Sequence, residues 1–183
     1  MPNNIIDVLG DLKPSTVNRN TRRSQEWLTN KIKKADKSKL TSKPLPGKMY
    51  LFRYDPKGKD TLPFYDVNPL IITLWTEGKH FMGLNLHYLP PRLRIVFLNK
   101  LMAYATSEKL NERTRMKLTY DLLAGASTLK MFRPTIKKYL FSHVRSKFAL
   151  IPADQWAMAV SLPLANFKKS SNAAVYKHSR SKF

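Results

Sequence analysis

The side chains in this sequence that could serve catalysis or metal binding are four histidines and a group of aspartates between positions 55 and 66. No histidine is spaced from another histidine or an acid as in a zinc-binding helix. Asp55, Asp60 and Asp66 are the carboxylates that a Mg²⁺-dependent nuclease would gather round its metal. However, Asp55 and Asp66 lie in or beside proline-rich turns, where aspartates cap backbone amides. We therefore expect no catalytic residue and no metal site, and a protein that is not an enzyme.

Two of the histidines have a structural interpretation. His143 lies on the apolar side of a predicted helix, so a hydrogen-bonded core histidine is expected there. His87 follows Asn85 and precedes Tyr88 at the end of a predicted strand, where a buried hydrogen bond is expected. The six glycines are scattered and none forms a phosphate-binding loop. The sequence thus predicts no cofactor and no small-molecule ligand.

Positive charge is the strongest signal in the composition. The 183 residues include 33 Lys and Arg against 12 Asp and Glu, a net charge of +21, and such a chain repels itself unless a polyanion is nearby. Residues 1–46 carry ten basic and four acidic residues (+6), residues 47–167 carry eighteen and eight (+10), and residues 168–183 carry five and none (+5). Because the central part is itself cationic, contact with a polyanion explains the charge better than solubility does.

Nucleic acid is the polyanion that this pattern favours, bound through its backbone. Such binding is independent of base sequence and weakens steeply with salt. The candidate nucleic-acid-binding residues are basic side chains of the N-terminal part, of a helix expected from Pro134 and of the C-terminal tail: Arg22, Arg23, Lys33, Lys34, Lys37, Arg133, Lys137, Lys138, Arg145, Lys168, Lys169, Lys177 and Arg180. DNA, RNA and an acidic protein stay open as partners.

Two other properties narrow the class of protein. The chain has no cysteine, which excludes disulfides and thiolate zinc sites. No stretch approaches the roughly 20 apolar residues that span a membrane, and the N-terminus has no signal-peptide pattern. We expect synthesis in the cytoplasm. The hydrophobic content of 43% and the 20 aromatic residues predict that the chain folds.

The elements that position these residues divide the chain into three parts. Residues 1–46 are predicted to be a basic arm with one short amphipathic helix from Ser24. Residues 47–167 form a single folded domain, and residues 168–183 form a basic tail that is expected to be mobile. The boundary near position 47 rests on two prolines and a glycine within residues 43–47.

The first part of the domain, residues 47–90, reads as short strands with tight turns. Residues 49–54 are aromatic and apolar, residues 69–75 are nearly continuously apolar, and Glu77-Gly78-Lys79 connects the latter to residues 80–86 as a hairpin. Along residues 50–54, the aromatic side chains alternate with Leu51 and Arg53, and which face points outward stays open. Core packing is favoured over base stacking for these rings.

The second part, residues 91–167, reads as helices. One helix is expected after Pro91, a second from about Asn111 to Gly125, a third from Pro134 and a fourth over residues 154–160. The predicted fold class is therefore α+β: a small SH3-like β-barrel or half-barrel followed by a bundle of three to four helices, with a basic N-terminal arm and a C-terminal tail.

Several short strings resemble one known family. They are residues 47–50, 54–57, 62–66 and 69–70, and above all Gly83-Leu84-Asn85-Leu86-His87-Tyr88-Leu89-Pro90. From about Gly47 to Trp156 the chain resembles a virion-associated family of contractile-tailed bacteriophages (myoviruses) that is known under structural-protein and DNA end protector labels. The resemblance implies a minor component of the phage virion, where the packaged genome meets the neck or tail, and brings no catalytic residue.

Three hypotheses follow. The first is a virion protein that binds nucleic acid non-specifically and holds or protects the end of packaged DNA, in contact with other virion proteins of the neck, portal or tail. The second is a structural neck or baseplate component that docks acidic neighbouring subunits. The third is a nuclease. We favour the first.

Overall fold

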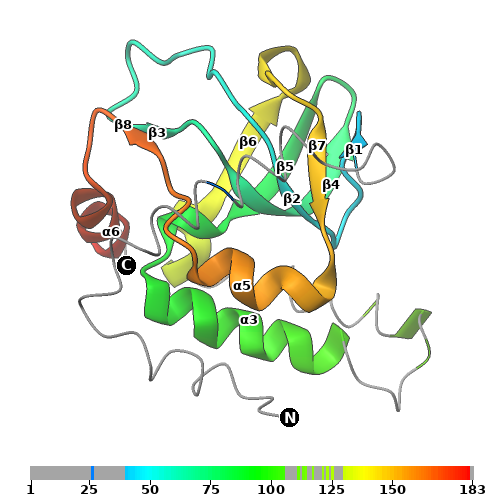
Figure 1. Cartoon of the computed structure of the whole chain (residues 1–183). Coiled ribbons are helices and arrows are strands. Elements are labelled where there is room, and N and C mark those ends of the chain that lie inside the picture. The colour runs from blue at the N-terminus through cyan, green and yellow to red at the C-terminus, as the bar shows by residue number, and fades with distance from the viewer. Residues whose placement is uncertain are drawn as a thin grey trace.

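A computed structural model describes residues 40–105 and 130–181, together with Glu26 and residues 111, 113, 114, 117, 121, 123 and 125. Its main element is a six-stranded antiparallel sheet in the order β1-β7-β2-β4-β5-β6 (Figure 1). The strands are β1 (Leu40–Thr41), β2 (Met49–Leu51), β4 (Leu70–Glu77), β5 (His80–Asn85), β6 (Ile136–Leu140) and β7 (Phe148–Ile151). A second sheet pairs β3 (Tyr65–Asp66) with β8 (Phe167–Lys168).

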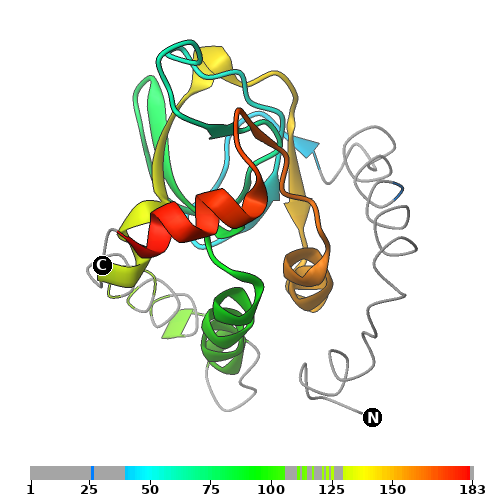
Figure 2. The same cartoon turned by 90° about the vertical axis from the view of Figure 1, so that its left-hand side faces the viewer.

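Three α-helices with defined bounds accompany the sheets. They are α3 (Pro91–Ala105), α5 (Trp156–Ser161) and α6 (Asn172–Arg180). Short 3₁₀ helices lie between these strands and helices: η3 (Leu86–Tyr88), η4 (Lys130–Thr135), η5 (Phe141–His143) and η6 (Ala153–Gln155). Helices α3 and α5 lie side by side next to the large sheet, whereas α6 lies near the small sheet (Figures 1 and 2). Within the described residues, no helix is long and apolar enough to cross a membrane.

The β4–β5 hairpin confirms the strongest local prediction. Its apolar run forms β4, and the tight connection contains Gly78 with a φ of 50°, a left-handed conformation that glycine adopts without a steric penalty. The register runs from Glu77 opposite His80 to Ile71 opposite Asn85, with one irregularity between Thr73 and Trp75. The hairpin thereby places Asn85 and the residues that follow it at one end of the sheet.

Both faces of the large sheet are buried. Met49, Leu51 and Ile72 point into a core that includes residues of α3 and α5. Tyr50, Phe52 and Tyr54 point the opposite way, into an aromatic cluster. The sequence left open which face of this segment points outward, and the structure shows that neither face of β2 does. The prediction that these rings pack in a core is confirmed.

The aromatic cluster draws distant strands together. The ring of Phe52 lies 5.4 Å from Tyr139 of β6 and 4.8 Å from Phe148 of β7, centroid to centroid. Three other strands separate β6 from β7 in the sheet. The sheet must therefore curve strongly, because only a curved sheet brings both strands to the same ring.

The predicted fold class is wrong in its arrangement. In the described part of the chain, a six-stranded antiparallel sheet is accompanied by a small second sheet and by three short α-helices with defined bounds, and there is no small barrel followed by a helical bundle. The main error is the helix expected from Pro134, because residues 136–140 form β6 and pair with β5. The spacing of Ile136, Tyr139 and Leu140 is also compatible with one face of a helix. Pairing with β5 and the burial of Tyr139 stabilise a strand instead.

The C-terminal tail also differs from the expectation. Residues 167–168 form β8, and residues 172–180 form α6, whose Ser171 cap accepts a hydrogen bond from the amide of Ala174. Val175 of this helix is fully buried. The prediction of a mobile tail is therefore wrong for this segment, because Val175 packs in the interior and the hydroxyl of Tyr176 accepts a hydrogen bond from Arg94.

Other predicted elements agree or lie outside the description. The helix expected after Pro91 is α3, and the one expected near residues 154–160 is α5, which begins at Trp156. The described residues at 113, 114, 117, 121, 123 and 125 are helical, as predicted for that stretch. The predicted arm helix from Ser24 lies outside the described residues, apart from Glu26. Strand β1, at the end of the predicted arm, pairs with β7.

Gly83 of β5 supplies a test of this packing. A Cβ atom at position 83 would lie 2.6 Å from Ile71 Cδ1 and 3.0 Å from Ile71 Cβ. Gly83→Ala should therefore lower the free energy of unfolding by about 1–3 kcal/mol through overpacking, as measured by urea denaturation. Gly58→Ala, whose Cβ would meet only the Thr61 hydroxyl at 3.3 Å, should cost less. Equal stability of the two variants would contradict the register of β4 and β5.

Candidate nucleic-acid interface

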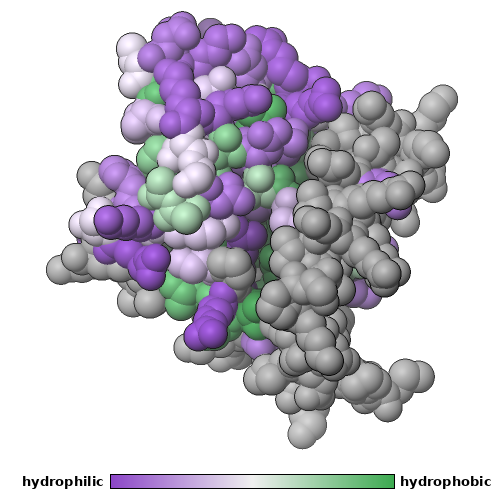
Figure 3. Space-filling model, turned by 60° about the vertical axis from the view of Figure 1, so that its left-hand side comes forward, coloured by the Kyte–Doolittle hydropathy of each residue, from purple (hydrophilic) through white to green (hydrophobic). Residues whose placement is uncertain are grey.

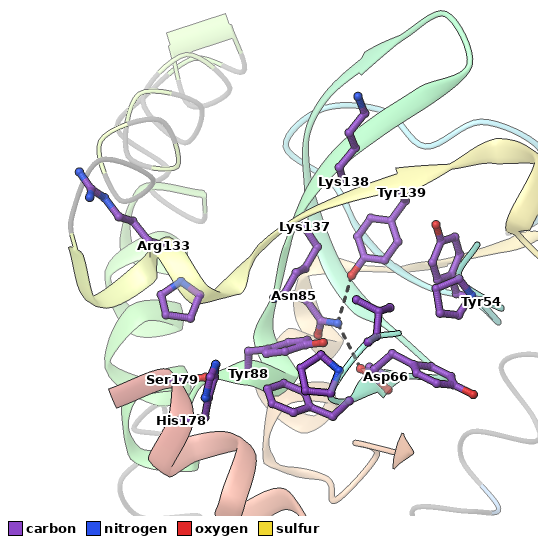
Figure 4. Close-up of a pocket in the computed structure, with 16 residues that line it drawn as sticks. Tyr54, Asp66, Asn85, Tyr88, Arg133, Lys137, Lys138, Tyr139, His178 and Ser179 are labelled. Carbon is purple, nitrogen blue, oxygen red and sulfur yellow. Dashed lines mark hydrogen bonds between the residues drawn. The ribbon is translucent and has the colours of Figure 1, made fainter. Parts of the chain in front are cut away.

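A pocket of about 560 Å³ opens beside the end of the large sheet. Four segments line it: the loop between β2 and β3 together with β3 itself, the end of β5 with η3, the η4–β6 segment and α6 (Figure 4). The lining residues are Tyr54, Pro56, Leu62, Pro63, Phe64, Tyr65, Asp66, Asn85, Tyr88, Arg133, Pro134, Lys137, Lys138, Tyr139, His178 and Ser179. Its volume falls in the range of sites that hold a small ligand or a single ligand group.

A buried carboxylate organises the floor of the pocket. Oδ2 of Asp66 accepts hydrogen bonds from Nδ1 of His87 at 2.6 Å and from Nδ2 of Asn85 at 3.1 Å. Oδ1 of the same carboxylate accepts from the backbone amide of Asn68 at 3.1 Å and that of Asn166 at 3.4 Å. Asp66 thus joins the loop before β4, the end of β5 and the strand β8.

The amide of Asn85 extends this network into the pocket. Its Nδ2 also donates to the hydroxyl of Tyr139 at 3.1 Å (Figure 4). Its Oδ1 accepts from the backbone amide of His87 at 3.0 Å. Asn85 and His87 are fully buried. Because both the Asp66 carboxylate and the Asn85 side-chain amide have defined partners, the network fixes the positions of the side chains that form the pocket floor.

The charge of Asp66 is stabilised by its partners. Burial by itself raises the pKa of a carboxyl group, but the attraction of His87 and the hydrogen bonds from His87, Asn85 and Asn68 outweigh it and lower the pKa of Asp66. Asp66 is therefore a structural anion, although its carboxylate lines the pocket.

Arg94 fixes the segment that carries Tyr88. Its Nε donates to the carbonyl of Leu89 at 2.7 Å, and its Nη2 donates to the carbonyl of His87 at 3.0 Å and to the hydroxyl of Tyr176 at 2.6 Å. Arg94 is buried, and burial lowers its pKa. This side chain therefore ties α3, η3 and α6 together behind the pocket.

Lys137 brings a cation into the pocket itself. Its Nζ lies 3.9 Å from the centroid of the Tyr88 ring. Among the described residues, no carboxylate forms an ion pair with Lys137. Burial lowers the pKa of Lys137 to about 8. The pocket thus contains a positive charge without a protein counterion.

The structure brings three of the predicted binding residues together. Arg133, Lys137 and Lys138 all line the pocket, with Arg133 and Lys138 exposed and Lys137 partly buried. The predicted reason was a helical face, but η4 and β6 place these residues instead. Figure 3 shows the side of the molecule on which α6 and the small sheet lie, and hydrophilic residues cover much of it.

The other predicted residues have different surroundings. The guanidinium of Arg145 lies 3.6 Å from the carboxylate of Asp55, away from the pocket. Nζ of Lys169 donates to the carbonyls of Lys59, Asp60 and Leu62, so this lysine holds the β2–β3 loop. Lys168, Lys177 and Arg180 are exposed on β8 and α6. Arg22, Arg23, Lys33, Lys34 and Lys37 lie outside the described residues.

Sequence reasoning anticipated part of the buried network. The prediction that His87 makes a buried hydrogen bond at a strand end is confirmed, and Asp66 caps backbone amides as expected. His143 is partly buried and its Nδ1 pairs with the carbonyl of Asp55 at 2.8 Å, although in a 3₁₀ helix. In the described residues, no three His, Asp or Glu side chains gather as a metal site would require.

Several pocket residues were not foreseen as a site. Asn85 and Tyr88 were noted only as parts of a sequence pattern, and His178 and Ser179 were placed in a mobile tail. The one signal that pointed to them was the string of residues 83–90, which includes Asn85, His87 and Tyr88. No local pattern indicates that α6 packs against this string.

A comparison with protein families establishes the family to which the chain belongs. The model of the family described as phage T4 terminal DNA protecting protein matches residues 5–181. The chain belongs to this family. The match confirms the resemblance to phage DNA end protectors and extends it over nearly the whole sequence. Comparisons with curated proteins and with solved structures gave no match.

Asp66 provides a test of the pocket floor. Asp66→Asn should lower the free energy of unfolding by about 3 kcal/mol or more, because it leaves buried donors without their acceptor. The folded pKa of Asp66 is below its unfolded value, so its contribution is complete above about pH 4 and is lost as the pH falls further. Urea titrations between pH 3 and pH 7 (roughly the range over which carboxylates titrate) should therefore show a weaker acid dependence in the variant.

Asp60→Asn is the matched control, because Asp60 is exposed. This variant should unfold like the wild type across the same pH range. If Asp66→Asn were as stable and as acid-sensitive as this control, the buried carboxylate would not hold the pocket together.

Proposed function

We propose that the protein binds DNA non-specifically close to its end and thereby protects the terminus. The observation that carries this proposal is that two exposed cations, Arg133 and Lys138, line the pocket in a chain that belongs to a family named for protecting terminal DNA. Both side chains are exposed, and neither pairs with an acid among the described residues. Their charges are therefore available to phosphates.

The contacts in this proposal are to the DNA backbone. Arginine and lysine that neutralise phosphates release condensed counterions, and this release drives binding to any base sequence. Lys168, Lys177 and Arg180 add exposed charge on β8 and α6, the second of which also lines the pocket. A net charge of +21 favours rapid, electrostatically steered association with DNA.

The proposal is for a binding protein and not for an enzyme. Protection requires that the terminus is occupied, and no bond need be made or broken. We further propose that the protein is made in the host cytoplasm and acts in the virion, where DNA meets the neck or tail. Its partners there would be other proteins of the neck, portal or tail.

A structural role in the neck or baseplate is a second candidate. Val96 of α3 is 54% exposed and Met158 of α5 is 45% exposed, and these helices lie side by side. Exposed apolar side chains on adjacent helices favour a protein contact. This surface does not include the pocket, so one molecule has room for both kinds of partner.

A salt titration tests the backbone contacts. The double variant Arg133→Gln/Lys138→Gln should bind duplex DNA of any sequence more weakly. The slope of log affinity against log salt concentration should fall by about 1.8, since each phosphate contact contributes about 0.9. Fluorescence anisotropy at several salt concentrations, with two duplexes of different sequence, measures both quantities.

Lys79→Gln/Lys147→Gln is the matched control, because these lysines are also exposed but do not line the pocket. It should change the slope less. Loss of binding to only one of the two sequences, or equal slopes for the two double variants, would contradict the proposed interface.

A further inference from the structure

The pocket is a recess, which binding to the surface of a duplex does not require. Phosphates on the outside of a double helix need only exposed cations, whereas this pocket has a volume of about 560 Å³ and a floor made of the buried residues Asp66, Asn85 and Tyr139. A double helix is too wide to enter such a space. One nucleotide that has left the helix is of suitable size.

The walls of the pocket suit a flat, partly apolar group. Phe64 lies 6.0 Å from Tyr88 and 5.3 Å from the ring of His178, centroid to centroid. Pro63 and Pro134 complete the apolar lining. Rings and prolines of this kind accept nucleobases of any identity, because every base has the same flat π-face.

The pocket also contains polar groups that lack an ion-pair or hydrogen-bond partner among the described residues. Lys137 has a positive charge that no carboxylate neutralises among the described residues. Ser179 also lines the pocket, and its hydroxyl is buried and has no hydrogen-bond partner among the described residues. A buried polar group without a partner costs free energy, which a ligand with an acceptor oxygen would recover. Figure 4 shows Ser179 and Lys137 on different walls of the pocket, one from α6 and the other from β6.

We propose that this pocket receives the unpaired terminal nucleotide of a DNA strand, with its base between the aromatic and proline walls and its phosphate at Lys137. The inference rests on the proposed function and specifies how an end is distinguished from the interior of a duplex. Removing a base from a helix costs a few kcal/mol in the interior and less where the base is already unpaired. A pocket for one extruded nucleotide therefore selects ends without reading sequence.

The two exposed cations of the pocket lining complete this arrangement. Arg133 and Lys138 would hold the phosphates that follow the terminal nucleotide, so they contribute to binding of any duplex. Lys137 lies deeper and contributes only when a nucleotide enters. The two positions on β6 therefore separate general DNA binding from recognition of an end.

The test compares two DNA molecules with the same duplex sequence. One is a linear duplex with a single unpaired, 5′-phosphorylated nucleotide at each end, and the other is a dumbbell whose ends are closed by hairpin loops with no free terminus. Wild-type protein should bind the linear duplex about tenfold more tightly, the size expected for one charged contact in a partly buried site. Anisotropy titrations of the intact chain measure both affinities.

Lys137→Met and Lys138→Met form a matched pair of variants. Lys137→Met should reduce the linear-to-dumbbell ratio to about one and should fold at least as well as the wild type, because it removes a cation that burial destabilises. Lys138→Met should weaken both affinities equally and leave the ratio unchanged. If Lys137→Met kept the full ratio, or if the wild type bound both molecules equally, the pocket would not hold a terminal nucleotide.

A pH series on the wild type gives a second measurement that needs no variant. A phosphate favours the charged form of Lys137, whose pKa in the free protein is about 8. Affinity for the linear duplex should therefore fall as the pH rises above about 8, by about tenfold in total, while affinity for the dumbbell stays nearly constant. Other charged or titratable groups that line the pocket are Tyr54, Tyr65, Asp66, Tyr88, Arg133, Lys138, Tyr139 and His178. A ratio that does not change with pH would contradict the role of Lys137.

The outcomes also distinguish this inference from the proposed function. If salt-dependent DNA binding persists and depends on Arg133 and Lys138, but no preference for ends exists, the inference fails and backbone binding stands. If the protein binds neither molecule at low salt, both fail.

Discussion

The buried carboxylate of Asp66 is the constraint on which the rest of the site depends. It accepts hydrogen bonds from four groups that lie in the β3–β4 loop, at the end of β5, in η3 and before β8. A charge with so little access to water is tolerated only when such partners surround it. The same contacts bring a loop, a hairpin and the C-terminal segment together. The pocket is the space that remains above this junction, so its shape follows from the network beneath it.

The electrostatics of the site follow from where each charge lies relative to that junction. The one carboxylate in the pocket lining is already satisfied by His87 and Asn85, so it does not neutralise the nearby cations. Lys137 is held over Tyr88 and burial lowers its pKa, whereas Arg133 and Lys138 remain in water. Exposed cations serve long-range attraction to a phosphate backbone. A partly buried cation such as Lys137 can bind only a partner that enters the pocket. This difference in depth is the physical basis for the proposal that the protein distinguishes a DNA end.

The sequence predicted the local features and missed the long-range ones. The hairpin around Gly78, the buried role of His87 and the strongly basic character follow from neighbouring residues. The helix from Pro134 was wrong because Ile136, Tyr139 and Leu140 fit a helical stripe, and only pairing with β5 decides for a strand. The prediction of a mobile tail was wrong because Val175 is buried beside Tyr88 and Phe167. No pattern in the sequence indicates this long-range contact. Arg133, Lys137 and Lys138 were chosen for their charge, and the structure shows that they line one pocket.

Photo-crosslinking from a defined position of the DNA tests the central claim most directly. A 5-iodouracil placed at the unpaired terminal nucleotide should crosslink to three of the aromatic residues that line the pocket, Phe64, Tyr88 and His178, as mapped by mass spectrometry. The same base placed in the middle of the duplex should not crosslink there. If the terminal base crosslinked only outside the pocket, or if both positions labelled these residues equally, the account of how this protein holds a DNA end would be contradicted.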